Sequence, residues 1–498
     1  MIDPCSVLGA VVSVALAALV PFGLHRLQLT ARFLRSRGRL RPVATSLAAG
    51  PLPRVTVQLP IYDERYVVER AIRAAAALDY PRDRLEIQVL DDSTDETRAI
   101  VARLVAELRA AGHAIEHVER GSRAGYKAGA LAHGMARAHG EIFAIFDADF
   151  VPPPDLLRRL LVPFADPRVG MVQARWSHAN RDASLLTRLQ ATLLDGHFVI
   201  EHTARFAAGC FFNFNGTAGA WRRAAIEEAG GWQHDTLTED LDLSYRAQLA
   251  GWRFVYLPFV TVPGELPVEM GAFRAQQRRW AMGSAQTVRK LAGRLWRAEL
   301  PLLVKLEALA HLGGNLAYLL MAVASVLIAP ALACRADAPA AVSAAWDVPL
   351  FTWGIGAMLV FYGTALVGLD RGGWRRLFEV PLAMGLGSAL ALSNAAAVLR
   401  GLAGERAAFE RTPKYGASAG RWRQAAYRVR ERVPWVELAL AVSSAVSVAL
   451  AVVTGTWLAL PFVSMLCFGY GYTAWRLLWD GRREPEPVAQ RASALEPI

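Results

Sequence analysis

The sequence predicts an α/β domain of Rossmann-like character joined to a bundle of transmembrane helices, and three observations support this fold class. Short apolar runs alternate with helical stretches between residues 54 and 265. Longer apolar runs of about 18 residues or more, enough to cross a bilayer, lie outside that region. In addition, 54% of the 498 residues are hydrophobic, which is high for a soluble protein.

The alternating region supplies the elements of an open sheet. The apolar runs are 55–59, 87–90, 142–146 and 171–174, and the helical stretches include 67–78, 94–111 and 128–138. Strands that alternate with helices in this way are typical of βαβ units and a parallel sheet. The first strand runs into Leu-Pro-Ile-Tyr-Asp-Glu at 59–64, not into a Gly-x-Gly-x-x-Gly turn. This difference argues against a dinucleotide-dependent dehydrogenase.

Five apolar runs are predicted to cross the membrane. They are 7–24, 306–330, 350–369, 435–453 and 458–478. If a sixth run at 380–399 also crossed, the nine basic residues of 400–432 would lie outside. Basic residues near spans normally stay inside. The sequence therefore predicts that about 374–399 lies along the cytosolic face as an interfacial helix, with the N-terminus outside and the C-terminus inside.

The chain start, the net charge and the cysteines add constraints. Residues 1–5 carry no Lys or Arg, whereas several arginines follow the first apolar run. This order indicates a retained anchor and not a cleaved signal peptide. The net charge of +11 lies mostly in such flanks, so membrane topology explains it better than nucleic-acid binding does. The four cysteines show no paired or metal-ligand spacing, and the sequence assigns them no role.

These patterns divide the chain into eight parts. They are an anchor (1–25), a basic juxtamembrane linker (26–53), a cytosolic α/β domain (54–265), amphipathic interfacial helices (266–300), two transmembrane helices (301–370), an interfacial helix with a basic loop (371–433), two further transmembrane helices (434–480) and a tail (481–498). The tail is charged and contains proline, which is typical of disorder.

Acidic residues end two of the predicted strands. Asp147 and Asp149 follow the run 142–146, and because side chains alternate along a strand they can point the same way. Open sheets bind ligands at such strand ends, and paired carboxylates suit Mg²⁺ or Mn²⁺ that also holds phosphate. Asp91 and Asp92 end another strand and can accept hydrogen bonds from a nucleoside. Asp-x-Asp alone is common in polar turns, so the metal site depends on the surrounding motifs.

Four further segments carry candidate residues. Lys127 lies near a helix start between glycines, where a cation can hold phosphate, and a surface lysine is the alternative. Residues 212–222 mix aromatics, amides and glycines, as binding loops do. Thr238 is predicted to cap the helix that holds the acids at 239 and 240. Gln-Gln-Arg-Arg-Trp at 276–280 can form a sugar and pyrophosphate platform, with an interfacial anchor as the alternative.

Six motifs occur in one order between residues 54 and 280. They are Val-Leu-Asp-Asp-Ser-Thr-Asp (89–95), Gly-Tyr-Lys-Ala-Gly-Ala-Leu (125–131), Asp-Ala-Asp (147–149), Phe-Asn-Gly-Thr-Ala-Gly (214–219), Thr-Glu-Asp (238–240) and Gln-Gln-Arg-Arg-Trp (276–280). In these motifs the chain resembles membrane-embedded processive family 2 glycosyltransferases of the cellulose synthase superfamily. It is most similar to the cellulose-synthase-like A branch (mannan and glucomannan synthases) and its bacterial relatives.

The resemblance implies a GT-A fold, an inverting transfer from a nucleotide sugar, and a role for each matched residue. The nucleotide sugar would be bound by Asp63, Glu64, Asp91, Asp92, Lys127, Asp147, Gln276, Arg279 and Trp280, the metal by Asp147 and Asp149, and the acceptor by Asn215, Gly216, Thr217 and Trp280. Asp240, with Glu239, would be catalytic as the general base. Residues 409–414 stand where cellulose synthases carry a gating loop, and the resemblance carries over only Thr412 and Lys414 from it. Asp63 stands where many relatives have Asn, so the resemblance does not decide whether the base of the donor nucleotide is uracil or guanine.

Physical chemistry supports this reaction independently. A nucleoside diphosphate leaves readily once a cation neutralises its charge, and the acceptor hydroxyl needs one carboxylate base. One base and one metal site give a single displacement with inversion, unlike the paired carboxylates of glycosidases. Together with the resemblance, this chemistry predicts transfer of a hexose from a UDP-glucose or GDP-mannose type of donor to a growing β-linked polysaccharide, which would pass through the enzyme's own helices.

Two other functions remain as alternatives. A non-processive enzyme that glycosylates a lipid such as diacylglycerol or ceramide is the first. A pure transporter would explain the spans but not the acid-ended strands. The expected partners are the donor, a polysaccharide or lipid acceptor, the lipid bilayer and, as an open alternative, periplasmic or accessory export subunits, whereas nucleic acid is not expected. The expected location is a bacterial-type inner membrane.

Overall fold

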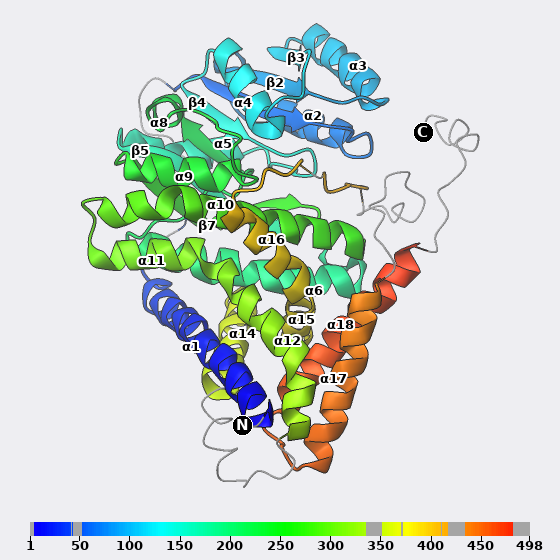
Figure 1. The fold of residues 1–498 in the computed structure, drawn as a ribbon. Coiled ribbons are helices and arrows are strands. Elements are labelled where there is room, and N and C mark those ends of the chain that lie inside the picture. Colours follow the sequence, from blue (N-terminus) through cyan, green and yellow to red (C-terminus); the bar gives the residue numbers. More distant parts are fainter. Residues whose placement is uncertain are drawn as a thin grey trace.

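Seven strands form one sheet at the centre of the α/β domain, which lies above a bundle of long helices in Figure 1. The computed structural model describes residues 4–40, 42, 52–334, 351–369, 372–409, 411–416 and 434–481. The strands are β1 (Val55–Ile61), β2 (Leu85–Asp91), β3 (Ile115–Glu119), β4 (Ile142–Ile145), β5 (Val169–His178), β6 (Gly219–Arg222) and β7 (Arg253–Gly264). The predicted disordered tail from 482, and residues 41 and 43–51 of the predicted linker 26–53, lie outside the described residues. The first part of that linker is helical, because α1 (Pro4–Ser36) continues to Ser36.

The sheet is mixed, with the strand order β3-β2-β1-β4-β6-β5-β7. β1 pairs in parallel with β2 and β4, β2 with β3, and β5 with β7, as βαβ units require. β6 pairs antiparallel with β4 and β5, so the prediction of a parallel sheet is wrong at this strand. Its four residues end a segment whose glycines and amides indicate a loop. Gly219 permits this pairing, because a Cβ there would lie 2.6 Å from the carbonyl oxygen of Val172.

Helices cover both faces of the sheet, close to the predicted positions. α2 (Val68–Ala76) and α3 (Thr97–Ala110) bury their apolar faces in one cluster with side chains of β1 and β2, including Val89. α4 (Tyr126–Arg137) packs on the other face, in the cluster that contains Leu90. Val89 and Leu90 are neighbours on β2, and their opposite directions follow from the alternation of side chains along a strand.

α9 (Glu239–Leu249) carries the two predicted catalytic acids in its first turn. It begins directly after Thr238, but the Thr238 hydroxyl makes no capping hydrogen bond. The carboxylate of Asp240 instead accepts from the backbone N–H of Leu241 at 2.8 Å. The prediction that Thr238 caps the helix is therefore wrong, because an acid within the first turn takes that role.

Among the described residues, five helices run along the bundle. They are α1 (Pro4–Ser36), α12 (Ala317–Cys334), α14 (Ala357–Leu369), α17 (Trp435–Val453) and α18 (Leu460–Gly481). Within the described residues, four helices are long and apolar enough to cross a membrane: 7–36, 314–334, 352–369 and 435–453. The predicted span 458–478 is helical as α18, but polar residues such as Arg476 keep it out of that group. The predicted span 306–330 starts too early, because the glycines at 313 and 314 separate α11 (Leu302–Leu312) from α12.

Contacts with the long helix α10 (Met270–Arg297), which lies beneath the α/β domain, orient the last two bundle helices. Glu437 at the start of α17 pairs with Arg274 of α10 at 2.7 Å. Asp480 near the end of α18 accepts from the backbone N–H of Met270 at 3.0 Å. α17 therefore runs away from the α/β domain, and α18 returns to it (Figure 1).

The predicted interfacial segment 374–399 contains a bent pair, α15 (Glu379–Ala389) and α16 (Ala391–Ala403), with 49° between them. At the start of the pair, Glu379 accepts from Arg181 of the α/β domain at 2.5 Å. Near its end, Gly401 packs so closely on α10 that a Cβ there would lie 2.6 Å from the carbonyl oxygen of Met282. The two ends of the pair thus contact the α/β domain and the helix α10 beneath it.

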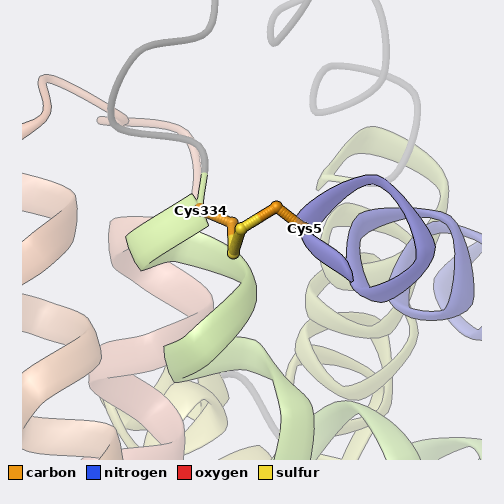
Figure 2. The surroundings of a disulfide bond; sticks show 2 residues. All are labelled: Cys5 and Cys334. Carbon is orange, nitrogen blue, oxygen red and sulfur yellow. A yellow bond between two sulfur atoms is a disulfide. The ribbon is translucent and has the colours of Figure 1, made fainter. Parts of the chain in front are cut away.

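A disulfide joins Cys5 of α1 to Cys334 at the end of α12 (Figure 2). It lies at the end of the bundle remote from the α/β domain, where Figure 1 places the N-terminus. The prediction that the cysteines have no role is wrong for this pair. The two residues are 329 positions apart, so only the packing of α1 on α12 reveals them as partners. Cys210 and Cys467 are free thiols.

Candidate active site

The carboxyl ends of β1, β2 and β4 meet at one edge of the sheet, and the strand order reverses between β1 and β4. Open α/β sheets bind ligands at such a point. A cavity of about 180 Å³ lies there, and the predicted residues that line it are Glu64, Asp92, Lys127, Asp147, Asp149, Asn215, Gly216, Glu239, Asp240, Gln276, Arg279, Trp280, Thr412 and Lys414. The structure thus brings together most of the predicted site, whereas Asp63, Asp91 and Thr217 lie outside this lining. We call this space the donor cavity.

Asp147 and Asp149 lie just past β4 beside two lysines. Lys127, in the first turn of α4, pairs with Asp147 and donates to the carbonyl oxygen of Gly216 at 2.9 Å. Lys414 donates to Asp149 at 2.6 Å, and Asp149 is only 2% exposed. Burial raises the pKa of Asp149, although the Lys414 ammonium opposes this shift. Burial disfavours the charge on both lysines, but the neighbouring carboxylates outweigh it and raise the pKa of each.

Asp240 and Glu239 open α9 close to Lys127. Burial, and then the charge of Glu239, raises the pKa of Asp240 to about 7. Burial also raises the pKa of Glu239. Gly216 faces Asp240 with φ of +80°, and a Cβ there would lie 3.0 Å from Asp240 Oδ2, so glycine is required. An acid with a pKa near neutrality is suited to accept a proton from a hydroxyl group.

Asp91 and Asp92 end β2 and are bound by neighbouring side chains. Asp92 accepts from both arms of the Arg120 guanidinium, at 2.7 Å from Nε and 2.5 Å from Nη2. Asp91 accepts from the backbone N–H of Ser93 at 2.8 Å and pairs with His117 at 2.9 Å. Of the two, Asp92 reaches the donor cavity. Arg120 is not part of the cavity lining, so it holds the Asp92 carboxylate from outside the cavity.

Asp63 and Glu64 follow β1. Asp63 adopts a left-handed φ of +52° and accepts from the backbone N–H of Thr94 at 2.7 Å, which ties the end of β1 to the loop after β2. Glu64 accepts two hydrogen bonds from Arg411, at 3.0 and 3.3 Å. Burial raises the pKa of Glu64 to about 7, and the Arg411 guanidinium opposes the rise.

Residues 411–416 reach from α16 into the donor cavity. Lys414 is one anchor of this segment. A second is Tyr415, whose hydroxyl donates to Glu269 at 3.0 Å. Thr412 of the same segment is only 6% exposed. Phe409 stacks under the guanidinium of Arg279, whose central carbon lies 4.3 Å from the ring centroid. Residue 410 of the predicted gating loop lies outside the described residues. The segment forms one wall of the donor cavity.

A second cavity connects the donor cavity to the bundle. Its volume is about 570 Å³, and it shares Trp176, Leu194, Asn215, Thr238, Asp240, Gln276 and Trp280 with the donor cavity. The rest of its wall comes largely from α1, α12, α14, α15 and α18, and includes Leu16, Leu332 and Phe462. We call this space the bundle cavity. Asp240 and Trp280 therefore stand between a polar pocket and a more apolar one.

Sequence patterns do not single out three residues that bind the predicted acids: Arg120, His117 and Arg411. Arg120 directly follows β3, and the carboxyl ends of neighbouring parallel strands meet. Recognition of β3 as a strand would therefore have placed Arg120 and His117 beside the acids that end β2. Arg411 pairs with Glu64 across 347 positions, for which the sequence carries no comparable signal.

Potential metal ligands occur at two places near this edge. Among the described residues, one group of three, Asp91, His117 and Glu119, has ligand atoms within 4.8 Å of one another. It lies at the ends of β2 and β3. The predicted site, Asp147 and Asp149, supplies two carboxylates, so a cation there would take further oxygens from a bound ligand.

Residues 53–283 match the family model described as "Glycosyltransferase like family 2". The chain is 48% identical over 251 residues to glucomannan 4-beta-mannosyltransferase 2 of Arabidopsis thaliana, covering 49% of this chain and 47% of the relative. It is 42% identical over 297 residues to probable glucomannan 4-beta-mannosyltransferase 3 of Oryza sativa, covering 55% and 54%. The chain thus spans about half the length of the curated relatives it matches.

A solved structure is similar over a longer part of the chain. It is a mannosyltransferase from Pyrobaculum calidifontis in complex with GDP-mannose and Mn²⁺, with 27% identity and a TM-score of 0.52. The similarity covers 72% of this chain and 98% of that one. The mixed sheet, the acids at its ligand-binding edge and these matches agree. Residues 53–283 are therefore a family 2 glycosyltransferase domain with a GT-A fold.

Proposed function

We propose that the protein is an inverting hexosyltransferase that transfers a sugar from a nucleotide donor to a growing β-linked polysaccharide. The observation that carries this proposal is the convergence of Asp149, Asp240, Lys127 and Trp280 on one cavity at the ligand-binding edge of the sheet. Relatives named as glucomannan 4-beta-mannosyltransferases, and a neighbour bound to GDP-mannose, support a mannosyl donor. UDP-glucose remains the second donor to test.

In this proposal Asp240 is the general base. It removes the proton of the acceptor hydroxyl as that oxygen attacks the sugar, which a pKa near 7 permits at neutral pH. Glu239 lies next to it and contributes to that pKa. Lys127 and Arg279 line the donor cavity as cations for the diphosphate. A single base on one side of the sugar gives inversion.

Asp147 and Asp149 fit a divalent cation. Each of these carboxylates is paired with a lysine ammonium, Lys127 or Lys414, so the site already stabilises positive charge. Their oxygens are the ligand type that Mg²⁺ and Mn²⁺ prefer. The similar mannosyltransferase was solved with Mn²⁺, which supports the same choice here. When bound, the cation would neutralise the negative charge of the leaving diphosphate.

The bundle cavity supports export of the product through the membrane helices. It begins at Asp240 and Trp280, where the acceptor would bind, and continues between α1, α12 and α18. Transfer to a membrane lipid is the second candidate, because apolar side chains such as Leu332 and Phe462 also suit a hydrocarbon chain. Accessory export subunits would meet the polymer at the outer end of the bundle.

Incubation of membranes with radiolabelled GDP-mannose or UDP-glucose tests this proposal. Labelled polymer that a β-mannanase or a β-glucanase degrades is the expected product. Label that extracts into organic solvent as a glycolipid would support the second candidate. Absence of transfer from both donors would contradict both candidates. Asp149→Ala should abolish transfer, because it removes a buried carboxylate of the proposed cation site.

We further propose a bacterial-type inner-membrane topology with the α/β domain in the cytosol. Nucleotide sugars are cytosolic, and the Cys5–Cys334 disulfide lies at the opposite end of the bundle. Disulfides persist in oxidising compartments such as the periplasm, so its position supports an outside N-terminus. The contacts of α17 and α18 with α10, and of both ends of the α15–α16 pair with the cytosolic side, support five crossings with that pair as an interfacial segment.

A further inference from the structure

Asn215 stands where the donor cavity and the bundle cavity meet, and two histidines hold its side chain. It lines both cavities, as Asp240 does. Its Oδ1 lies 2.5 Å from Nε2 of His202, and its Nδ2 lies 3.1 Å from Nε2 of His197. Because an amide oxygen only accepts and an amide nitrogen only donates, His202 donates to Asn215 and His197 accepts from it.

This pairing fixes the proton on each ring. His202 is fully buried, and burial holds its pKa well below its ordinary value, so the ring is neutral with its proton on Nε2. His197 accepts at Nε2 and therefore carries its proton on Nδ1, which faces Glu201 at 3.5 Å. Because Glu201 holds the Nδ1 proton of His197, a turned Asn215 amide would place its oxygen opposite the acceptor Nε2 of His197 and lose that hydrogen bond. Its orientation at the junction of the cavities is thus determined.

The oriented amide keeps hydrogen-bonding capacity for a ligand. An asparagine side chain has two N–H donors and two acceptor lone pairs, and the histidines use one of each. The backbone N–H of Asn215 is taken by Gln173 at 3.0 Å. With respect to the described residues, one N–H and one lone pair of the side chain remain. A sugar hydroxyl both donates and accepts, so it matches this pair beside Asp240.

His197 is itself anchored to the first bundle helix. It belongs to η4 (Gly196–Glu201), a π-helical turn of a kind that is frequent at functional sites. Glu201, at the end of this turn, binds Arg205 at 2.8 Å and also pairs with Arg26 of α1. A continuous series of contacts therefore runs from α1 through Glu201 and His197 to Asn215.

We propose that His197, acting through Asn215, orients a hydroxyl group of the acceptor sugar toward Asp240. His197 is a positioning residue, since Asn215 lies between it and the reacting atoms. The inference rests on the proposed function and specifies its acceptor side: the end of the acceptor at this junction is a sugar with free hydroxyl groups. Water can attack the donor without such orientation, so hydrolysis of the donor should not depend on His197.

The test compares polymer formation with hydrolysis of radiolabelled GDP-mannose by the full-length protein in membranes. His197→Ala removes the acceptor of the Asn215 N–H, whereas the side-chain oxygen of His197→Gln can replace it. We expect His197→Ala to lower transfer at least about tenfold, since misplacement of a reacting group by about 1 Å can cost about 100-fold. Hydrolysis should stay within about twofold, and His197→Gln should recover most of the transfer. His133→Ala, an exposed histidine of α4, is the matched control.

Each outcome decides the proposal. A selective loss of transfer with rescue by Gln supports positioning. If transfer and hydrolysis fall together, or if neither changes, the proposal is overturned, and thermal unfolding of each variant shows whether the protein remains folded. Wild-type protein that neither transfers nor hydrolyses GDP-mannose or UDP-glucose overturns the proposed function and this inference together. That result is seen before any variant is compared, so the two failures are distinguishable.

Discussion

Burial beside Glu239 raises the pKa of Asp240 to about 7, whereas an exposed aspartate titrates near about 4. A general base works only when it is unprotonated, so the rate of transfer should rise with pH through the region around 7. The sign follows from the role, because protonated Asp240 cannot accept the hydroxyl proton. Measurement of kcat between pH 5.5 and 9 checks this. A rate that is flat from pH 5.5 upward would contradict a base with a raised pKa.

Replacement of Asp240 by asparagine keeps the size of the side chain but removes its basicity. Asp240→Asn should lower transfer by about 10²–10⁴-fold, the usual contribution of a positioned base. Binding of the nucleotide, measured by calorimetry with GDP and Mn²⁺, should change less than about twofold, because Asp147 and Asp149 are intact. Asp83→Asn, with a side chain that is 79% exposed, is the control. An active Asp240→Asn enzyme would exclude this base.

The position of several candidate residues at the cavity could be predicted because their pattern is visible locally. Asp147 and Asp149 directly follow an apolar strand, and Lys127 stands beside a left-handed glycine, Gly125, at a helix start. Their convergence follows from the geometry of parallel strands, whose ends meet at one edge. The pairing of Glu64 with Arg411 could not be predicted in this way. It depends on how a segment after the bundle packs against the α/β domain.

The segment 411–416 is held in the donor cavity mainly by ion pairs of Arg411 and Lys414 with buried acids. Removal of one partner of such a pair leaves an uncompensated buried charge, which is strongly destabilising. We therefore expect Arg411→Ala to loosen the segment. Thr412, which is 6% exposed, serves as a reporter once it is replaced by cysteine. Maleimide should label Thr412→Cys at least about tenfold faster when Arg411→Ala is also present.

The control for this experiment lies in the same chain. Cys210 and Cys467 are free thiols and are replaced by serine before labelling. Arg98→Ala removes an arginine that pairs with an exposed acid of the α/β domain, and it should leave the labelling rate unchanged. Equal labelling rates with and without Arg411→Ala would show that this ion pair does not hold the segment.

Helices and strands could be predicted where the spacing of apolar residues and the length of the run indicate the same element. They could not be predicted where contacts with neighbouring strands or helices determine the conformation. α2, α3 and α4 have apolar faces that the sequence displays, and each lies within a few residues of its predicted range. β6 could not be recognised, because Gly219 and Ala220 favour a loop by composition and form a strand only between β4 and β5. The glycines at 313 and 314 turn one predicted span into α11 and α12.

At the scale of the whole molecule, the donor cavity and the bundle cavity share one set of residues. Asp240, Asn215, Gln276 and Trp280 belong to both cavities, so donor chemistry and the membrane bundle meet at one place. Apolar runs predict the bundle, and acid-ended strands predict the domain. The junction between them is formed by α10, which lies within the predicted amphipathic segment 266–300, and by η4, for which the sequence predicts no element. This explains why His197 and Glu201 were not singled out.

The Cys5–Cys334 disulfide gives a direct test of how the molecule lies in the membrane. With Cys210 and Cys467 replaced by serine, an impermeant maleimide added to intact cells should label Cys5 and Cys334 only after an impermeant phosphine reduces their bond. Cys334→Ser leaves Cys5 without its partner, so this variant should be labelled without the phosphine. Thr412→Cys should react only after detergent opens the membrane, because its segment contacts the cytosolic domain. If Cys5 also required detergent, the N-terminus would lie inside, and the proposed direction of export through the bundle would have to be reversed.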